Sequence, residues 1–217
     1  MVWPALKLSL LVALTATVLV TAAGTALGWL LARKKFRGRE LLDALLMLPL
    51  VLPPTVTGYY LIVMLGRRGV LGGPLHELTG LAIPFSWVAC VIAAAVVALP
   101  LMVRAARGAF ESIDTDYLLA GASLGHSPWT VFCRVAVPLA RRGLATGIVL
   151  SFARAIGEFG ATLLLAGNIA GRTQTLPLAI YEALLTGDDR AALTISIVLT
   201  AVSLVAMALI ARLGSRR

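Results

Sequence analysis

The sequence has little charge for its length. Only 13% of its 217 residues are Asp, Glu, Lys or Arg, whereas 59% are hydrophobic and the mean hydropathy is +0.94. A soluble domain carries about 25% charged residues, and it would have to expose such an excess of apolar side chains as patches that drive association. The composition therefore excludes an ordinary soluble globular enzyme and a disordered chain.

Side chains with nucleophilic or metal-ligating chemistry are also scarce. The two cysteines lie far apart in the sequence, as do the two histidines, which argues against a disulfide scaffold, a metal site and a Ser-His pair. Only three lysines are present and there is no G-x-x-x-x-G-K-[ST] loop, so the chain has no visible means of hydrolysing a nucleotide. We therefore predict no catalytic residue, no metal site and no cofactor bound by this chain.

Long apolar runs are what the sequence has in abundance. A membrane span needs about 20 predominantly apolar residues, and five stretches meet this condition. They cover residues 8–32, 41–66, 84–103, 143–167 and 191–211. We therefore predict an all-α polytopic membrane protein with five transmembrane helices, forming one domain over residues 5–213 within the lipid bilayer.

The basic residues identify the predicted cytoplasmic side. Residues 33–40, residues 104–142 and the tail after residue 211 hold 13 of the 19 Lys and Arg residues, and they alternate with the other connections across five spans. Because cytoplasmic loops are rich in Lys and Arg, we expect the N-terminus outside and the C-terminus inside. The first span then reads as an uncleaved anchor, since its basic cluster follows it. Topology accounts for the net charge of +9, so nucleic acid is not an expected partner.

The long cytoplasmic segment, residues 104–142, reads as folded. Residues 114–116 offer N-cap chemistry for an apolar helix over 117–124, and Gly125 suits the left-handed residue that ends a helix. Ser127-Pro128 then begins a second helix, which Pro138 is expected to end or kink.

Two interpretations of this folded loop remain open. It either packs on the membrane-facing surface of its own chain or is presented to a soluble partner, with Leu118, Leu119 and Trp129 as apolar contacts. An apolar helix has little reason to project into the cytoplasm unless another protein covers it, which favours the second interpretation.

Arg154 and Glu158 are the charged residues inside the fourth predicted span. They are four residues apart, which places them on one helix face, where burial in hydrocarbon is tolerable if they pair, face the bundle interior or meet water. They form either a neutralising pair that locks two helices or part of a pathway or gate. Gly157 and Gly160 allow close helix contact, possible at a dimer interface.

Prolines interrupt the second predicted span. Pro49, Pro53 and Pro54 each remove a backbone N–H, so the helix must bend or open there. Thr55 and Thr57 offer hydroxyls to an oxyanion at that point; the alternative is a packing kink without any ligand.

The external segment 168–189 is amphipathic. Thr175 is expected to cap a helix with Pro177 in its first turn and Gly187 after its end. Leu176, Ile180 and Leu184 would share its apolar face. An interfacial position on lipid would explain this face, and the alternative, an outer gate or a contact with an external protein, is equally open.

Basic residues also occur on this side. Arg67, Arg68 and Arg172 are suited to steer a dianion or an acidic partner.

Residues 119–138, LAGASLGHSPWTVFCRVAVP, resemble the EAA motif of ABC importer permeases. The matching positions are Ala120, Gly125, Val135, Val137 and Pro138. Leu119 stands where the motif has Glu, and Gly121 where it has its second Ala, so an ion pair from that Glu to the ATPase is not expected here. In this family the motif forms a coupling helix that inserts into a groove on the ATPase subunit.

Three further stretches extend the resemblance to the permease of molybdate ABC importers. They are LPLVLPPTVTGYYL at 48–61, GRRGVLG at 66–72 and ARAIGEFGATLLLAGNIAGRTQTLPLAIY at 153–181. The sulfate/thiosulfate permeases have a similar ARxxGEFG run and form the alternative, and tungstate is not separable from molybdate. A membrane-embedded enzyme is a further alternative, but it would need more ionisable groups within the spans than Asp43, Arg154 and Glu158.

The resemblance implies the type I ABC importer permease fold and a transport subunit without enzymatic activity, located in the bacterial inner membrane. Its expected partners are a second copy of the chain, an extracytoplasmic oxyanion-binding protein and two ATPase subunits, which carry ATP and Mg²⁺. Alternating access would move molybdate inward. The expected functional residues form an ATPase-coupling set (Leu118, Leu119, Ala120, Gly121, Gly125, Trp129, Val135, Pro138), a pathway or gate set (Pro53, Pro54, Thr55, Thr57, Arg154, Gly157, Glu158, Gly160) and an external set (Arg172, Gln174, Pro177).

Overall fold

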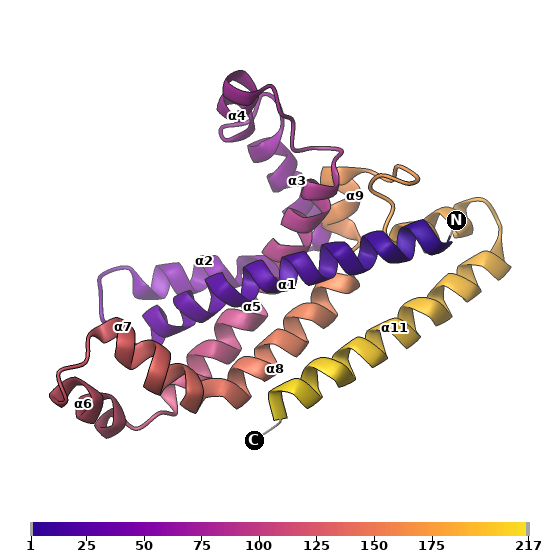
Figure 1. Cartoon of the computed structure of the whole chain (residues 1–217). Helices are drawn as coiled ribbons and strands as arrows, with labels where there is room; N and C mark the ends of the chain where they lie inside the picture. Colours follow the sequence, from indigo (N-terminus) through magenta and orange to yellow (C-terminus); the bar gives the residue numbers. More distant parts are fainter. Residues whose placement is uncertain (1, 216–217) are drawn as a thin grey trace.

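The computed structural model describes residues 2–215, and this part of the chain is helical without strands. Arg216 and Arg217 of the predicted basic tail lie outside the described residues. The all-α class is confirmed. The elements are α1 (Val2–Arg33), α2 (Arg39–Val51), α3 (Pro54–Leu65), α4 (Gly72–Thr79), α5 (Trp87–Glu111), α6 (Thr115–Ser123), α7 (Pro128–Val131), the π-helical turn η1 (Phe132–Ala136), α8 (Val137–Ile156), α9 (Gly160–Ala166), α10 (Leu176–Leu185) and α11 (Asp189–Ser215) (Figure 1).

Four helical segments among the described residues are long and apolar enough to cross a membrane. They are Val2–Arg33, Trp87–Glu111, Pro128–Ile156 and Asp189–Ile210. The predicted span 41–66 is instead the pair α2 and α3, which is bent by 115°, and counting this pair as one span gives five. The predicted proline bend is thus present, and it lies at Leu52-Pro53, between the two helices.

Small residues let α1, α5 and α8 pack closely as the body of the molecule. A Cβ atom added at Gly24 or Gly28 of α1 would lie 2.5 Å from Met102 or Ala106 of α5. A Cβ atom added at Gly147 of α8 would lie 2.7 Å from the same residue, Met102. Because lipid is as apolar as a leucine side chain, such close van der Waals contact stabilises helix pairs within a membrane.

The fourth predicted span, 143–167, is not one helix. The long helix that contains its first part begins at Pro128, passes through η1 and ends at Ile156, and α9 begins at Gly160. Pro138 does not end the helix, because the π-helical turn just before it accommodates the ring: the Val137 N–H donates to the Phe132 carbonyl, five residues back.

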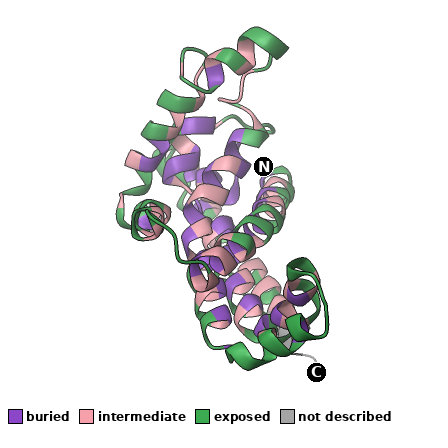
Figure 2. Ribbon diagram, turned by 90° about the vertical axis from the view of Figure 1, so that its left-hand side faces the viewer, coloured by how far each residue is buried: buried purple, intermediate pink, exposed green. Residues whose placement is uncertain are grey.

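The periphery is much less buried than the three-helix body. α3 rises away from the bundle and leads to α4 (Figure 1), which is mostly exposed or half-buried at the top of Figure 2. Of the apolar 18-residue stretch of α11, only 6% is buried inside the molecule, compared with 56% of the corresponding stretch of α5. These apolar surfaces are available to lipid or to another protein.

Candidate functional site

Two helix breaks that are distant in the sequence lie against each other. Gly160, at the start of α9, faces Pro54, at the start of α3: a Cβ atom on Gly160 would lie 3.0 Å from the Pro54 Cβ. One turn further along, a Cβ atom on Gly58 would lie 2.8 Å from the Cα of Ala161. The structure therefore brings the predicted proline break together with Gly160, one of the two glycines predicted to allow close helix contact. We call this contact between the starts of α3 and α9 the broken-helix junction.

The predicted Arg154–Glu158 pair lies at this junction. Arg154 Nη1 is 2.8 Å from Glu158 Oε2, and the Glu158 side chain is 2% exposed against 27% for Arg154. The other carboxylate oxygen, Oε1, accepts the Ala161 backbone N–H at 2.8 Å. The carboxylate thus joins the end of α8 to the beginning of α9, and the sequence reading missed this second contact.

The remaining predicted pathway residues differ in their exposure. Gly157 follows the last residue of α8 and is exposed, and so are Pro53, Pro54 and Thr55. Thr57 is buried at 5% exposure, and its hydroxyl oxygen has no hydrogen-bond partner among the described residues. The two threonines predicted to act together therefore lie in different environments.

At the opposite end, α6 and α7 form a folded loop that we call the apolar knob, residues 114–131. Asp114 accepts the Asp116 N–H, Ser127 accepts the Thr130 N–H, and Gly125 has a φ of +79°, as the sequence predicts. Leu119 and Trp129 are 57% and 72% exposed.

Other members of the predicted coupling set have different surroundings. Ala120 and Pro138 are exposed, Val135 is half-buried, and Leu118 is half-buried with part of its side chain packed against the core. Gly121 is buried: a Cβ atom there would lie 3.3 Å from Val131 Cγ2, which explains why this position suits glycine better than alanine.

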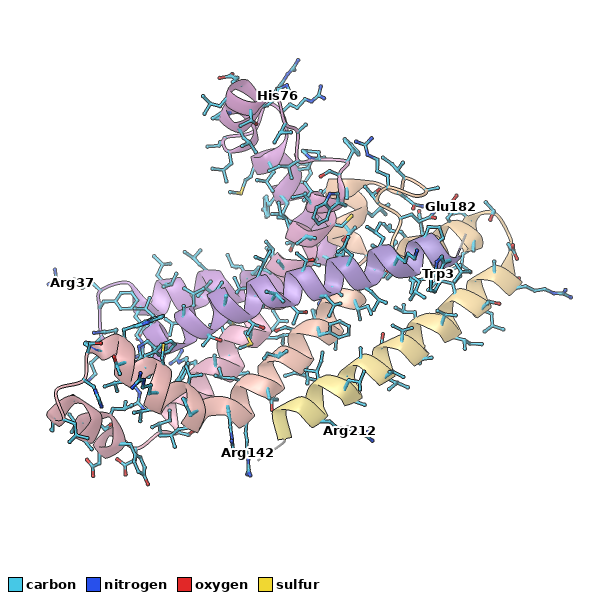
Figure 3. All side chains as sticks on the ribbon, viewed as in Figure 1. Trp3, Arg37, His76, Arg142, Glu182 and Arg212 are labelled. Carbon is cyan, nitrogen blue, oxygen red and sulfur yellow. The ribbon has the colours of Figure 1, made fainter. Side chains whose placement is uncertain are left out.

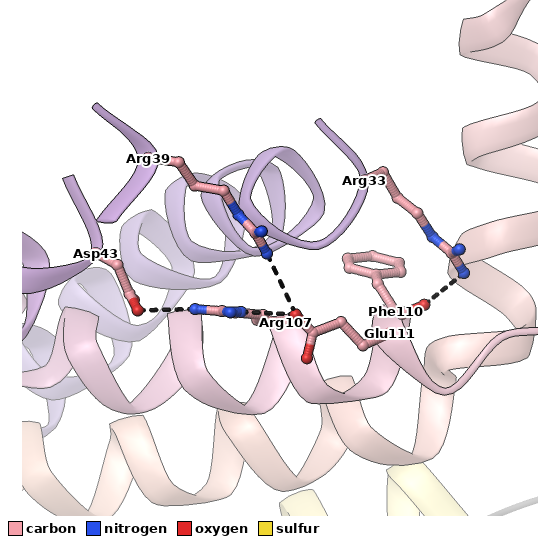
Figure 4. Close-up of polar contacts among 6 residues, drawn as sticks. All are labelled: Arg33, Arg39, Asp43, Arg107, Phe110 and Glu111. Carbon is pink, nitrogen blue, oxygen red and sulfur yellow. Dashed lines mark hydrogen bonds and ion pairs between the residues drawn. The ribbon is translucent and has the colours of Figure 1, made fainter. Parts of the chain in front are cut away.

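The knob is attached to the bundle by aromatic rings and one arginine. The Phe132 ring lies 5.2 Å from Trp29 of α1 and 5.5 Å from Trp129 of the knob. Arg33, at the end of α1, donates to the Phe110 and Ile113 carbonyls at 2.6 Å, where α5 ends (Figure 4). These contacts link the segment around the knob to α1 and α5.

An ionic cluster at the same end ties α2 to α5, and the sequence reading did not find it. Arg107 contacts Asp43 Oδ2 at 2.7 Å and Glu111 Oε1 at 2.8 Å, and Arg39 lies 3.5 Å from the same Glu111 oxygen (Figure 4). The i,i+4 spacing of Arg107 and Glu111 is a signal that was available in the sequence.

The predicted external segment folds back on the bundle. Gln174 is 7% exposed and donates to Asn168 Oδ1 and to Glu182 Oε2, and the Leu176 N–H donates to Ser9 Oγ of α1 at 2.7 Å. Figure 3 places Glu182 beside Trp3, at the end of α1 opposite Arg37.

Only part of the expected geometry of α10 is present. Pro177 lies in its first turn and Thr175 at its N-cap position, although the Thr175 hydroxyl makes no capping bond. Its buried residues include Leu176, Ala179 and Ala183, whereas Leu184 is 57% exposed, so the bundle covers only the first part of the expected Leu176–Ile180–Leu184 face. Arg172 is exposed.

The described residues contain no group of three or more His, Cys, Asp or Glu side chains able to hold a metal ion. The arrangement instead comprises the broken-helix junction and, at the basic end, the apolar knob held by aromatic and arginine contacts.

Comparison with known proteins identifies the family. The family described as "Binding-protein-dependent transport system inner membrane component" matches residues 24–217. The "Molybdenum transport system permease protein ModB" of Escherichia coli K12 is 44% identical over 219 residues, covering 99% of this chain and 96% of that protein. The "Sulfate transport system permease protein CysW" of Synechococcus elongatus is 37% identical, covering 98% and 74%.

A solved structure shares the fold. A chain from a bacterial ABC transporter involved in the import of the acidic polysaccharide alginate superposes with a TM-score of 0.76 at 15% identity. The match covers 97% of this chain and 78% of the other. At this level of identity the likeness concerns the fold alone.

Proposed function

The chain belongs to the family of binding-protein-dependent transport system inner membrane components, and from this premise we propose that it is the permease subunit of an ATP-driven molybdate importer. It is a multi-pass protein of the bacterial inner membrane. The observation that carries the choice of molybdate is the 44% identity to a molybdenum permease over 99% of the chain. Tungstate, which has the same charge and nearly the same size, is expected to follow the same route.

The apolar knob is the proposed contact with the ATPase. Leu119 and Trp129 are exposed although they are large and apolar, and they lie at the basic end that the positive-inside rule places in the cytoplasm. Two ATPase subunits, which hold ATP and Mg²⁺, would each cover one knob. Burying these side chains favours docking, since each large apolar residue gains about 1.5–3 kcal/mol on full burial.

The transport pathway is proposed to lie between two copies of the chain, at the broken-helix junction. α3 exposes Tyr59 and Val63, which are 59% and 52% exposed and have little reason to face water. Arg154 of α8 is partly exposed and is neutralised by Glu158, so the junction is not a strong fixed anion site. This suits a conduit, from which the ion must be released.

Alternating access then follows from the connections between the two ends. ATP binding would bring the ATPases together and move the knobs, and Arg33 and the aromatic contacts would carry this movement to α1 and α5. An extracytoplasmic binding protein would deliver the anion at the end that carries Glu182 and Trp3. The chain itself would hydrolyse nothing.

Sulfate is the alternative cargo, because the sulfate permease relative is 37% identical over 98% of the chain. The test is uptake by the reconstituted permease–ATPase complex with its binding protein, comparing molybdate, tungstate and sulfate. We expect uptake of molybdate and tungstate and little of sulfate. Preferential uptake of sulfate would show that sulfate, and not molybdate, is the cargo. Uptake of none of the three anions would refute the proposal.

A further inference from the structure

A cavity of about 730 Å³ opens where α3 ends and α5 begins. Its walls come from three separate parts of the chain: the end of α3 with Arg67, the connection 80–86 that leads into α5, and Arg172 after α9. None of the sequence motifs discussed above predicted this cavity, because its walls include residues as far apart in the sequence as Ile62 and Arg172.

Two arginines give the cavity its charge. Arg67 and Arg172 both line it, and its lining contains no carboxylate. Within residues 2–215 neither guanidinium is in an ion pair, whereas Arg107 and Arg154 are each held by a carboxylate. Two unpaired cations around one concave surface produce a positive potential that concentrates anions.

The start of α5 adds to this potential. Ser86, which lines the cavity, caps this 25-residue helix by accepting the Ala89 N–H. The N-terminus of a helix carries a partial positive charge, so the dipole of α5 acts in the same direction as the two arginines.

The size of the cavity determines what kind of anion it takes. A volume of 730 Å³ equals that of about two dozen water molecules at ~30 Å³ each. A bare tetrahedral oxyanion would be loosely held there, but a hydrated one is accommodated, and weak binding permits onward release. Apolar residues such as Leu81 and Phe85 supply the rest of the wall and no competing charge.

The cavity is physically connected to the broken-helix junction. The Phe85 N–H donates to the Leu165 carbonyl of α9 at 3.2 Å, so the wall before α5 is fixed to α9. Ile62, in another wall, belongs to α3, whose first turn contacts Gly160. An anion in the cavity therefore lies next to the two helices that form the junction.

We propose that this cavity is an extracytoplasmic vestibule that binds a hydrated dianionic tetrahedral oxyanion through Arg67 and Arg172. The proposal rests on the proposed function for the identity of the anion, molybdate. It gives the anion a place to reside after the binding protein releases it and before the junction opens.

Thiol labelling in intact cells tests the vestibule. The variant Ala82→Cys, made with Cys133→Ser so that buried Cys90 is the other cysteine, places a reactive group on the cavity wall. An impermeant anionic methanethiosulfonate should label it about tenfold faster than in the additional Arg67→Gln/Arg172→Gln double variant. Arg190→Gln is the matched control, because Arg190 is exposed at the start of α11 and does not line the cavity, and it should leave the rate nearly unchanged.

Occupancy is tested with molybdate and sulfate at millimolar concentration, without the binding protein. Either anion should slow labelling by both an anionic and a neutral reagent when the two arginines are present, and should have no effect in the double variant. Equal rates in all variants, absence of labelling from outside, or protection that requires the binding protein would each overturn the proposal.

The outcome is separable from that of the proposed function. A complex that takes up molybdate but shows none of these labelling effects refutes the vestibule alone. Anion protection in a complex that takes up no molybdate supports the vestibule and refutes molybdate transport.

Discussion

Glu158 makes two contacts with one carboxylate, and both explain why a charge is tolerated at this depth. One oxygen pairs with Arg154, and the other accepts the first-turn N–H of Ala161 in α9. The i,i+4 spacing predicted the ion pair, but the cap depends on where α8 ends, which neither hydropathy nor proline marks. The sequence therefore predicted the partner and missed the second contact.

This double role leads to a graded prediction for Glu158. Glu158→Ala removes the ion pair and the cap and leaves Arg154 unneutralised. We therefore expect the free energy of unfolding to fall by about 3 kcal/mol or more. Glu158→Gln keeps an oxygen for the Ala161 N–H, so its free energy of unfolding should fall by about 1 kcal/mol less than that of Glu158→Ala. Thermal unfolding of the purified complex measures the order, and equal losses in both variants would show that the cap contributes nothing.

Gly58 and Gly108 form a matched pair at the same scale. A Cβ atom on Gly58 would lie 2.8 Å from the backbone of α9, whereas a Cβ atom on Gly108 of α5 meets nothing within 4 Å. We expect Gly58→Ala to lower the melting temperature and Gly108→Ala to leave it unchanged or raise it, since alanine is favoured in helices by about 0.5–1 kcal/mol. A melting temperature unaffected by Gly58→Ala would contradict close α3–α9 packing.

At the scale of elements, the apolar knob was the best predicted part of the chain and the fourth span the least well. Asp114, Gly125 and Ser127 act through local chemistry, so their caps and turn are readable from neighbouring residues. The end of α8 is set by tertiary contacts, above all Gly160 against Pro54, and the stretch 143–167 remains apolar on average across it despite Arg154 and Glu158. Hydropathy therefore reads 143–167 as one span where the fold has two helices.

Gly125 is the element-scale test of the knob's shape. No neighbouring atom would clash with a Cβ atom at this position, but its φ of +79° is unfavourable for a β-branched residue. Gly125→Val should therefore destabilise the turn by about 1–2 kcal/mol. We expect reduced uptake with ATP hydrolysis partly retained. Gly125→Asn is the control, because asparagine tolerates this conformation, and it should keep uptake coupled to ATP hydrolysis. Fully coupled uptake in Gly125→Val would contradict the assignment of the knob as the ATPase contact.

The exposed side chains of the knob are tested separately from its shape. Trp129→Glu places a charge on the proposed ATPase contact, where Trp129 is 72% exposed, and should abolish co-purification of the ATPase without changing the folding of the permease. Leu78→Glu is the control: Leu78 is 85% exposed on α4, away from the knob, and should leave co-purification intact. Retention of the ATPase by Trp129→Glu would mean that docking occurs elsewhere.

At the scale of the whole molecule, charge and hydropathy together predicted the class and the number of apolar segments. The bend of α2 against α3 was predicted from Pro49, Pro53 and Pro54, of which Pro49 lies inside α2, whereas its angle of 115° and the meeting of the two breaks required the structure. The sequence predicted Arg67 and Arg172 as residues that steer a dianion, but only folding brings them around one cavity. Local chemistry was thus readable, and long-range convergence was not.

The central claim is that a push on the apolar knob, powered by ATP, moves molybdate across the membrane. Uptake of labelled molybdate and ATP hydrolysis, measured together in proteoliposomes holding the permease, its ATPase and its binding protein, tests it most directly. We predict that molybdate-loaded binding protein stimulates hydrolysis and that uptake ceases without ATP. Uptake that continues without ATP, or hydrolysis that proceeds at full rate with no molybdate entering, would contradict the claim.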